Sequence, residues 1–232
     1  MHHWTIKGSD KEFSTPQNWS EITISKFAQY QDLVKELQKD FIEVFNLKDE
    51  TEINTITDVE ILNVFPTYYL KIICFWSGLT HSEALKINKK DFFAVYIKLN
   101  QTLGESLKDQ NLESFEFKGL EYLFPKNTQD INGNIAYMGG ESFGSMIYMF
   151  QQEQNLKELG KGRFDVIAKQ MAISCRPEGE EYDPDKTNVR AKIFKDLSMD
   201  VVWQWVFFSI RQTKKYKRTT KIYSEGEAKS QS

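Results

Sequence analysis

The sequence VEILNVFPTYYLKIICFWSGL, at residues 59–79, is the most hydrophobic stretch of the chain and constrains its fold most strongly. Its length raises the question of a membrane span, because about 20 apolar residues cross a bilayer. Pro66 interrupts the stretch, and Lys71 would cost a few kcal/mol at a bilayer centre. We therefore expect a short helix, a break near Pro66, a central helix buried on all sides, and no contact with a membrane.

The residues that follow this stretch predict how the central helix ends and the next one begins. Gly78 is typical of a helix C-cap, because glycine adopts the left-handed conformation without steric strain. The sequence Thr80-His81-Ser82-Glu83 has the form of a capping box, in which the hydroxyl and the carboxylate each bind a backbone amide. We expect His81 to lie exposed in the first turn of that helix.

The N-terminal half also contains a long amphipathic helix. Thr23 is the predicted N-cap, and the apolar residues after it recur at intervals of three and four positions. This spacing places them along one seam that faces a core. The seam consists of Phe27, Tyr30, Val34, Leu37, Phe41 and Val44.

The apolar period changes from helical to alternating at FEFKGLEYLF, residues 115–124. Alternation on both sides of Lys118-Gly119 predicts a small β-hairpin with a two-residue turn. Residues 125–134 read as a turn-rich loop, and helical patterns follow to the end of the apolar sequence. The last pattern, residues 199–208, has apolar side chains on every face and must be covered on all sides.

The fold class predicted from these patterns is mainly α, with two helical groups flanking a small β-hairpin and a basic C-terminal arm. The chain of 232 residues is long enough for one large domain or two small ones. We expect a polar leader at residues 1–15, an N-terminal helical part at 16–110, a hairpin with a C-terminal helical part at 111–210, and a basic tail at 211–232.

The charge distribution separates the tail from the rest of the chain. The formal net charge is -3, but residues 211–232 hold seven Lys or Arg and two Glu, so the body is acidic. An acidic body argues against a main nucleic-acid surface, because phosphate binding needs clustered basic residues. The tail alone could contact phosphate, a partner protein or only solvent. Its candidate contact residues are Lys214, Lys215, Tyr216, Lys217, Arg218 and Lys221.

Candidate chemistry is sparse in this sequence. Residues 140–144, Gly-Glu-Ser-Phe-Gly, match the G-x-S-x-G pattern of a nucleophile elbow. That mechanism needs a histidine after the serine, whereas His2, His3 and His81 all precede Ser142. No phosphate-binding glycine motif and no metal-spaced Cys/His set is present. We expect no enzyme activity, no catalytic, cofactor or metal residues, and reduced thiols at Cys74 and Cys175, with a disulfide left open.

An acidic segment at residues 176–188 is the second candidate contact site. Its spacing does not match a calcium-binding loop, which needs a glycine at the sixth position. We interpret it as a solvated loop that could dock a basic segment, including the tail of another copy. Its acidic residues are Glu178, Glu180, Glu181, Asp183 and Asp185.

Several of these elements together resemble a known group of phage proteins. They are WSEIT at residues 19–23, GLTHSE at 78–83, the hairpin, IAKQMAISCRPEGEEYDPDK at 167–186, and FKDLSMDVVWQWVFF at 194–208. Over residues 16–210 the chain resembles structural and tail-assembly-chaperone-like proteins of tailed bacteriophages, especially phages of gut Bacteroidetes.

The resemblance implies a non-enzymatic role in building a virion, as a neck or tail component or as a transient tail assembly chaperone. Its partners would be other phage structural proteins or copies of the chain itself, and its location the virion or the cytoplasm of the host bacterium. The basic tail is not expected of a simple chaperone, and it leaves nucleic-acid contact as an alternative.

Overall fold

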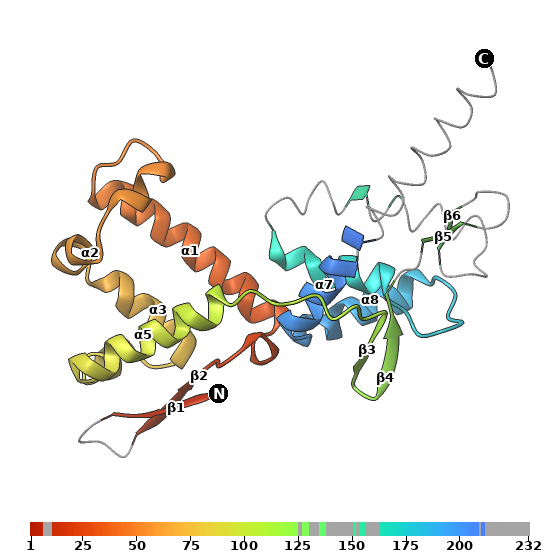
Figure 1. Ribbon diagram of the computed structural model, residues 1–232, viewed down its shortest axis with the longest axis horizontal. Helices are drawn as coiled ribbons and strands as arrows, with labels where there is room; N and C mark the ends of the chain where they lie inside the picture. Colours follow the sequence, from red (N-terminus) through yellow and green to blue (C-terminus); the bar gives the residue numbers. More distant parts are fainter. Residues whose placement is uncertain are drawn as a thin grey trace. The chain divides into compact units, whose positions relative to one another are not determined.

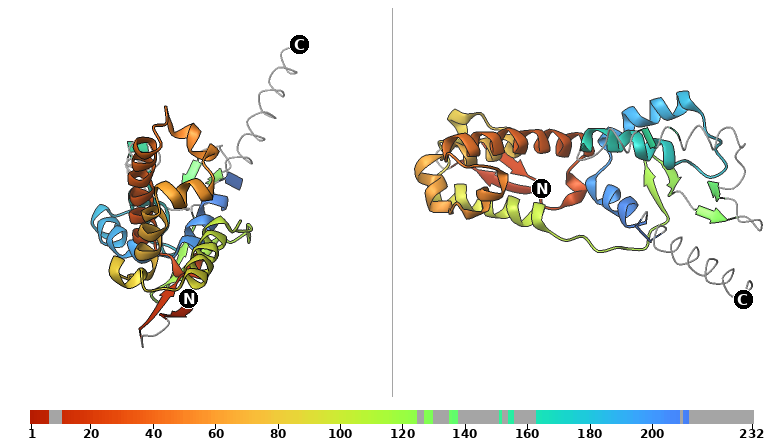
Figure 2. Two further views of the ribbon diagram at one scale, coloured as in Figure 1. Left: turned by 90° about the vertical axis from the view of Figure 1, so that its left-hand side faces the viewer. Right: turned by 90° about the horizontal axis from the view of Figure 1, so that it is seen from above.

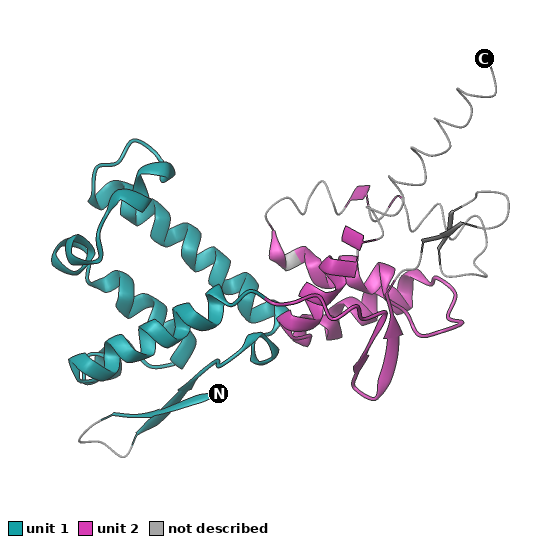
Figure 3. Cartoon of the chain, viewed as in Figure 1, with its two compact units in different colours: residues 1–106 teal, residues 107–232 magenta. Residues whose placement is uncertain are grey.

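The chain divides into two compact units, Met1–Ser106 and Leu107–Ser232, and each is described by itself (Figure 3). The boundary lies slightly before the expected one between residues 110 and 111. The computed structural model describes residues 1–6, 11–124, 127–129, 135–137, 151, 154–155, 163–208 and 210–211.

Unit 1 consists of helices together with an N-terminal hairpin (Figure 1). Its two strands are β1 (His2–Thr5) and β2 (Glu12–Thr15), and its 3-10 helices are η1 (Trp19–Glu21) and η2 (Glu50–Thr55). Its α-helices are α1 (Ile24–Val44), α2 (Asp58–Val64), α3 (Thr67–Ser77), α4 (His81–Ala84) and α5 (Lys89–Gly104).

The caps that the sequence predicted define where these helices begin and end. The Thr23 hydroxyl accepts from the Lys26 N–H and starts α1. Gly78 ends α3 with φ 70°, a left-handed conformation that glycine adopts readily. Thr80 and Glu83 form the predicted capping box at α4. Each of these caps is formed by residues within a few positions of the helix end.

The central helix is less enclosed than predicted. Tyr69, Leu70, Ile72, Ile73 and Trp76 of α3 are buried, but Lys71 lies on a partly exposed side of the helix. The Lys71 ammonium binds Asp40 Oδ2 at 2.8 Å and Glu36 Oε1 at 3.2 Å, both from α1. The lysine therefore links α3 to α1 at the surface, and the predicted burial on all sides is wrong on this side.

The amphipathic seam of α1 is confirmed over most of its length. Phe27, Leu37 and Phe41 are buried and Tyr30 and Val34 half-buried, while Val44 at the C-terminal end is exposed. Figure 2 shows α1 and α5 running along opposite sides of the unit.

The N-terminal residues differ from the expected polar leader, because they form a hairpin. Trp4 pairs with Phe13 across the strands, their rings are stacked, and the Trp4 indole N–H donates to the Thr15 hydroxyl at 3.1 Å. Ile6, Phe13 and Thr15 are buried, and β2 packs beside α3. The polar composition concealed this hairpin, because only alternate positions of the second strand face inward.

Unit 2 contains two short strand pairs and several helices. The strands are β3 (Ser114–Phe117), β4 (Leu120–Leu123), β5 (Asn127–Gln129) and β6 (Ile135–Tyr137). The helices are η3 (Phe164–Val166), α7 (Ile167–Ser174), α8 (Pro184–Ile193) and η4 (Phe194–Asp196), and residues 199–208 and 210–211 are also helical. Strand β5 lies within the segment expected to be a loop.

The predicted hairpin is confirmed and contributes to the core of unit 2. Phe115 pairs with Tyr122, and the turn residues Lys118 and Gly119 have the positive φ angles that a tight two-residue turn requires. The Phe194 ring contacts Phe115, Phe117 and Tyr122 with centroid distances of 5.8, 6.0 and 5.0 Å. Phe194 is fully buried, so η4 provides the residue on which the hairpin packs.

The last helix is covered along its apolar length, as its composition predicted. None of residues 199–208 is exposed. The buried Gln204 side chain donates to the Lys108 carbonyl and accepts from the Gln110 N–H, both at 2.9 Å. Arg211 pairs with Asp109 and belongs to this helix rather than to the predicted tail.

The fold is therefore mainly α with a small β-hairpin, as predicted. Across the part of the chain that the structure describes, no helix is both long and apolar enough to cross a membrane. The two cysteines are free, with Cys175 buried and Cys74 partly exposed.

Candidate protein-interaction surface

Two adjacent pockets in unit 1 form the candidate interaction surface. They share Tyr69 of α3 and Phe93 of α5 as a common wall. One pocket has an apolar lining with a single lysine, and the other has an aromatic and polar lining with a single aspartate. We refer to them as the apolar pocket and the acidic aromatic pocket.

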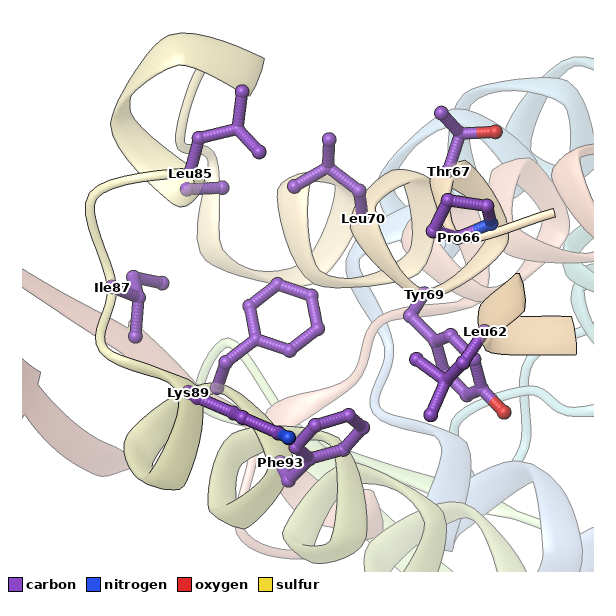
Figure 4. Close-up of a pocket in the computed structure, with 11 residues that line it drawn as sticks. Leu62, Pro66, Thr67, Tyr69, Leu70, Leu85, Ile87, Lys89 and Phe93 are labelled. Atoms are coloured by element: carbon purple, nitrogen blue, oxygen red, sulfur yellow. The ribbon is translucent and has the colours of Figure 1, made fainter. Parts of the chain in front are cut away.

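The apolar pocket has a volume of about 340 Å³ and lies between α2, α3, α4 and α5. Figure 4 shows Leu62 and Pro66 on one side of it and Leu85 and Ile87 on the other. Its remaining lining residues are Thr67, Tyr69, Leu70, Ala84, Lys89, Phe92 and Phe93.

Local capping places Leu85 at the rim of the apolar pocket. The Thr80–Glu83 box starts the single turn of α4, Ala84 of that turn is buried, and Leu85 follows it with 72% of its surface exposed. The ion pair with Lys11, together with hydrogen bonds from Thr80, lowers the pKa of Glu83 to about 2. The cap therefore stays charged at all pH values near neutral.

Two partly exposed leucines and one lysine, Lys89, line this pocket, and two further lysines lie next to its lining residues in the sequence. Leu62 is 38% exposed, so with Leu85 two large aliphatic side chains remain in water at the rim. Lys86, Lys89 and Lys90 are exposed, and no described residue forms an ion pair with any of them. An apolar opening with a charged rim is typical of a site that receives an apolar group of another molecule.

The acidic aromatic pocket has a volume of about 420 Å³ and adjoins the apolar pocket along α5. Asp58 at the start of α2 accepts a hydrogen bond from the Tyr69 hydroxyl, with 2.8 Å between the oxygens. The Tyr96 ring meets the Tyr69 ring at 86° with centroids 4.7 Å apart. Its other lining residues are Phe93, Ile97, Asn100 and Gln101.

Tyr69 in the wall of this pocket, together with Tyr68 and Tyr30 of unit 1, stays protonated over the physiological range. Burial, followed by the hydrogen bond to Asp58, raises the pKa of Tyr69. Burial and the neighbouring Tyr96 raise the pKa of Tyr68, and the same two causes raise that of Tyr30 to about 12. These phenols therefore act as neutral hydrogen-bond donors and aromatic surfaces rather than as bases.

In the predicted acidic docking loop, two carboxylates bind groups of unit 2 and three are exposed to solvent. Glu180 forms an ion pair with Arg190 of α8, and the Asp183 carboxylate accepts from the N–H groups of Asp185 and Lys186 as the N-cap of that helix. Glu178, Glu181 and Asp185 are exposed. Only these three carboxylates of the five predicted face solvent without an internal partner of this kind.

Two arginines are buried beside this loop, which the sequence did not indicate. Arg190 is 6% exposed, and it donates to the Ala172 carbonyl at 3.2 Å as well as binding Glu180. Arg176 is fully buried and donates to the Glu180 carbonyl at 3.1 Å. Burial, and secondarily the Arg190 charge, lower the pKa of Arg176 to about 10. Both arginines fix the loop on α7 and α8, so we assign them a structural role.

The remaining predicted residues lie apart from these pockets or outside the described residues. Lys214, Lys215, Tyr216, Lys217, Arg218 and Lys221 of the basic tail, and Ser142 of the G-x-S-x-G pattern, lie outside them. His2 and His3 are in β1, and His81 is exposed in α4 as expected. Within the described ranges, no group of His, Cys, Asp and Glu could hold a metal ion.

Sequence reasoning missed both pockets, because their lining residues come from four helices. The one local signal was the run from residue 85 to residue 90, Leu-Lys-Ile-Asn-Lys-Lys, where apolar and basic residues alternate at the start of α5. Comparison with known proteins found no match to a family model, to a curated protein or to a solved structure.

Proposed function

We propose that this protein is a non-enzymatic structural or assembly protein of a tailed-bacteriophage virion, a neck or tail component that acts through protein–protein contacts. The observation that carries the proposal is the apolar pocket of unit 1, with exposed Leu62 and Leu85 at its rim. Such a pocket suits the insertion of an apolar side chain from a partner. The partners proposed are other phage structural proteins or further copies of the chain.

The chemistry of the rim supports a protein partner over a small apolar ligand. Lys89 lines the pocket together with Leu85, and Lys86 and Lys90 are exposed beside these residues in the sequence, so an incoming surface can bring both apolar contact and carboxylates. A polar, charged rim around an apolar centre is the usual organisation of a protein interface. The phage context rests on the resemblance of residues 16–210, and the proposed location is the virion or the host cytoplasm.

The test is made on phage particles produced with an altered gene. Mass spectrometry of purified virions is expected to detect the protein if it is a resident component. If it is a transient assembly chaperone, purified virions lack it, and cells without the gene accumulate heads without tails. Normal particles assembled without the protein would contradict both forms of the proposal.

A substitution inside the pocket connects this phenotype to the surface. Leu85→Glu places a carboxylate at the apolar rim and is expected to reduce the yield of infectious particles by at least about tenfold, because it replaces an apolar contact with a charge. Val189→Glu is the matched control, since Val189 is an exposed aliphatic residue of α8 in unit 2. Equal yields from the two variants would exclude the apolar pocket as the functional surface.

A further inference from the structure

The two pockets of unit 1 carry single charges of opposite sign. Among the described residues that line the apolar pocket Lys89 is the charged one, and among those of the acidic aromatic pocket it is Asp58. Tyr69 and Phe93 line both pockets, so their rings form the boundary between the two. Tyr69 is 1% exposed and belongs to the wall, which leaves the groups around it to contact a partner.

The spacing of residues on two helices places each charge at its own pocket. In α5, Lys89, Phe93 and Ile97 follow one another at intervals of four positions and therefore lie on one stripe of the helix. At about 1.5 Å per residue, Lys89 and Ile97 are roughly 12 Å apart along the helix axis. In α2 the same interval joins Asp58, at the acidic aromatic pocket, to Leu62, at the apolar pocket.

Both charges are available to another molecule. The Asp58 Oδ1 accepts from the Tyr69 hydroxyl at 2.8 Å, which orients the carboxylate, and no described residue donates to its Oδ2. The Lys89 side chain is exposed, and Figure 4 shows it extending along α5 toward Phe93. Within the described ranges, neither charge belongs to an ion pair. An ion pair with a partner therefore replaces no internal one.

Exposed aliphatic side chains accompany both charges. Leu62 and Leu85 of the apolar pocket are 38% and 72% exposed, and Ile97 of the acidic aromatic pocket is 53% exposed. Covering them with another apolar surface removes them from water, and such burial is the main favourable contribution to protein association. A fitting partner therefore brings apolar groups to Leu85 and Ile97, an anion to Lys89 and a cation to Asp58.

The same surface of a second copy of the chain brings all of these groups. A two-fold axis that passes between the two pockets places the apolar pocket of one copy opposite the acidic aromatic pocket of the other. Lys89 then faces Asp58 of the second copy, Leu85 faces its Ile97, and each contact occurs twice. Charges of opposite sign at the two pockets make the surface complementary to itself.

We propose that unit 1 forms a two-fold symmetric dimer through this surface, in which Lys89 of each copy pairs with Asp58 of the other. The dimer deepens the proposed function and rests on it, since it takes the apolar pocket as a protein interface and names a second copy as the partner. The two are tested separately, because the dimer is measured on the purified chain. A dimer whose loss leaves the yield of phage particles unchanged would contradict the virion role alone.

The mass of the purified full-length chain in solution is the first test. Analytical ultracentrifugation over a range of concentrations is expected to show a monomer–dimer equilibrium. Lys89→Glu brings two carboxylates together at both contacts and is expected to raise the dimer Kd at least roughly tenfold. Lys98→Glu is the matched control, since Lys98 is an exposed lysine of α5 that lines neither pocket. A monomer at every concentration, or equal weakening by both variants, would overturn the proposal.

A mixture of two charge-reversed variants tests the two-fold arrangement itself. Chains with Lys89→Glu and chains with Asp58→Lys each repel their own kind, because like charges meet at both contacts of either homodimer. A dimer with one chain of each kind regains an ion pair at both contacts. Native mass spectrometry is therefore expected to find mainly this heterodimer in the mixture. No more heterodimer than homodimer would show that Lys89 and Asp58 do not face each other, and the proposed dimer would be wrong.

A second form of this experiment covers a folding defect of the Asp58→Lys chain, which loses the acceptor for the Tyr69 hydroxyl. Circular dichroism shows whether that chain folds. Asp58→Asn keeps an acceptor, and in the same chain as Lys89→Glu it removes the contact between two carboxylates. This double variant is expected to dimerise more tightly than Lys89→Glu alone. Equal Kd values for the two would contradict the proposed contact.

Discussion

Aromatic rings pack on one another in both units, and in unit 1 some of these rings also line pockets. In unit 2 the rings of Phe115, Tyr122 and Phe194 close on one another, and Arg190 pairs with Glu180 away from solvent. In unit 1 the rings of Tyr69 and Phe93 line two pockets, and Lys89 lines one of them and Asp58 the other. The Tyr69 and Phe93 rings also contact each other, so the same side chains stabilise unit 1 and line its pockets. Unit 1 is therefore the better candidate for recognition.

The largest expected effect is on the packed aromatic cluster of unit 2. Phe194→Ala removes a fully buried ring that contacts both strands of the hairpin, and it should lower the free energy of unfolding by about 3–5 kcal/mol. Urea denaturation followed by circular dichroism measures this. Phe194→Leu, which keeps most of the volume, should recover part of the loss. A loss below about 1 kcal/mol for the alanine variant would show that the cluster can collapse around the cavity.

A smaller effect is expected at the buried ion pair. Glu180→Gln leaves Arg190 buried without its counter-charge, and because Glu180 is partly exposed we expect a loss of about 2 kcal/mol rather than more. The double variant with Arg190→Met should be destabilised less than the sum of the two single variants. Additive losses in this double-mutant cycle would mean that the two side chains are not coupled.

The Glu83 carboxylate, which caps α4, predicts that the stability of the fold depends on pH. The pKa of Glu83 is lowered from its ordinary value of 4.5 to about 2, so its folded form prefers the charged state. Its contribution to stability is complete above pH 4.5 and is lost as the pH falls toward 2. Thermal melting of the wild type and of Glu83→Gln over this range should show the two curves converging in acid. A constant difference at every pH would contradict the assigned cause.

The smallest effect on folding is expected at the rim of the apolar pocket. Leu85→Glu should change the free energy of unfolding by no more than about 0.5 kcal/mol, because the side chain is 72% exposed. Val189→Glu should behave alike in the same denaturation experiment. Because neither substitution should change stability, a lower particle yield in the virion assay can be attributed to binding. A large loss of stability for Leu85→Glu would show instead that the pocket is part of the core of unit 1.

Local features of the structure followed closely from the sequence. The caps at Thr23, Gly78 and Thr80 are found where they were predicted, as are the turn at Lys118-Gly119 and the break at Pro66. Each depends on hydrogen bonds or dihedral angles within a few residues, so residue type alone determines them. The N-terminal hairpin was missed, since the burial of its second strand depends on contact with α3.

The partners of the charged side chains could not be predicted from the sequence. The acidic loop at residues 178–185 was predicted as one solvated site, yet Glu180 faces a buried arginine ten positions further along the chain. Lys71 was predicted in a helix buried on all sides, yet it binds two carboxylates of α1 at the surface. The sequence does not tell which group a charged side chain pairs with. The free energy of the charged form depends on how deeply the side chain is buried and on which groups lie within a few ångströms of it.

The sequence by itself determined that this chain is mainly helical, where α1 and α4 begin and α3 ends, and that its last apolar helix must be covered. Only the tertiary structure decided that Tyr69 and Phe93 separate two pockets of opposite charge. Hydrophobic periodicity encodes which face of a helix turns inward. It does not encode whether the faces of four helices meet completely or leave an opening, because that depends on side-chain volumes at the places where they cross.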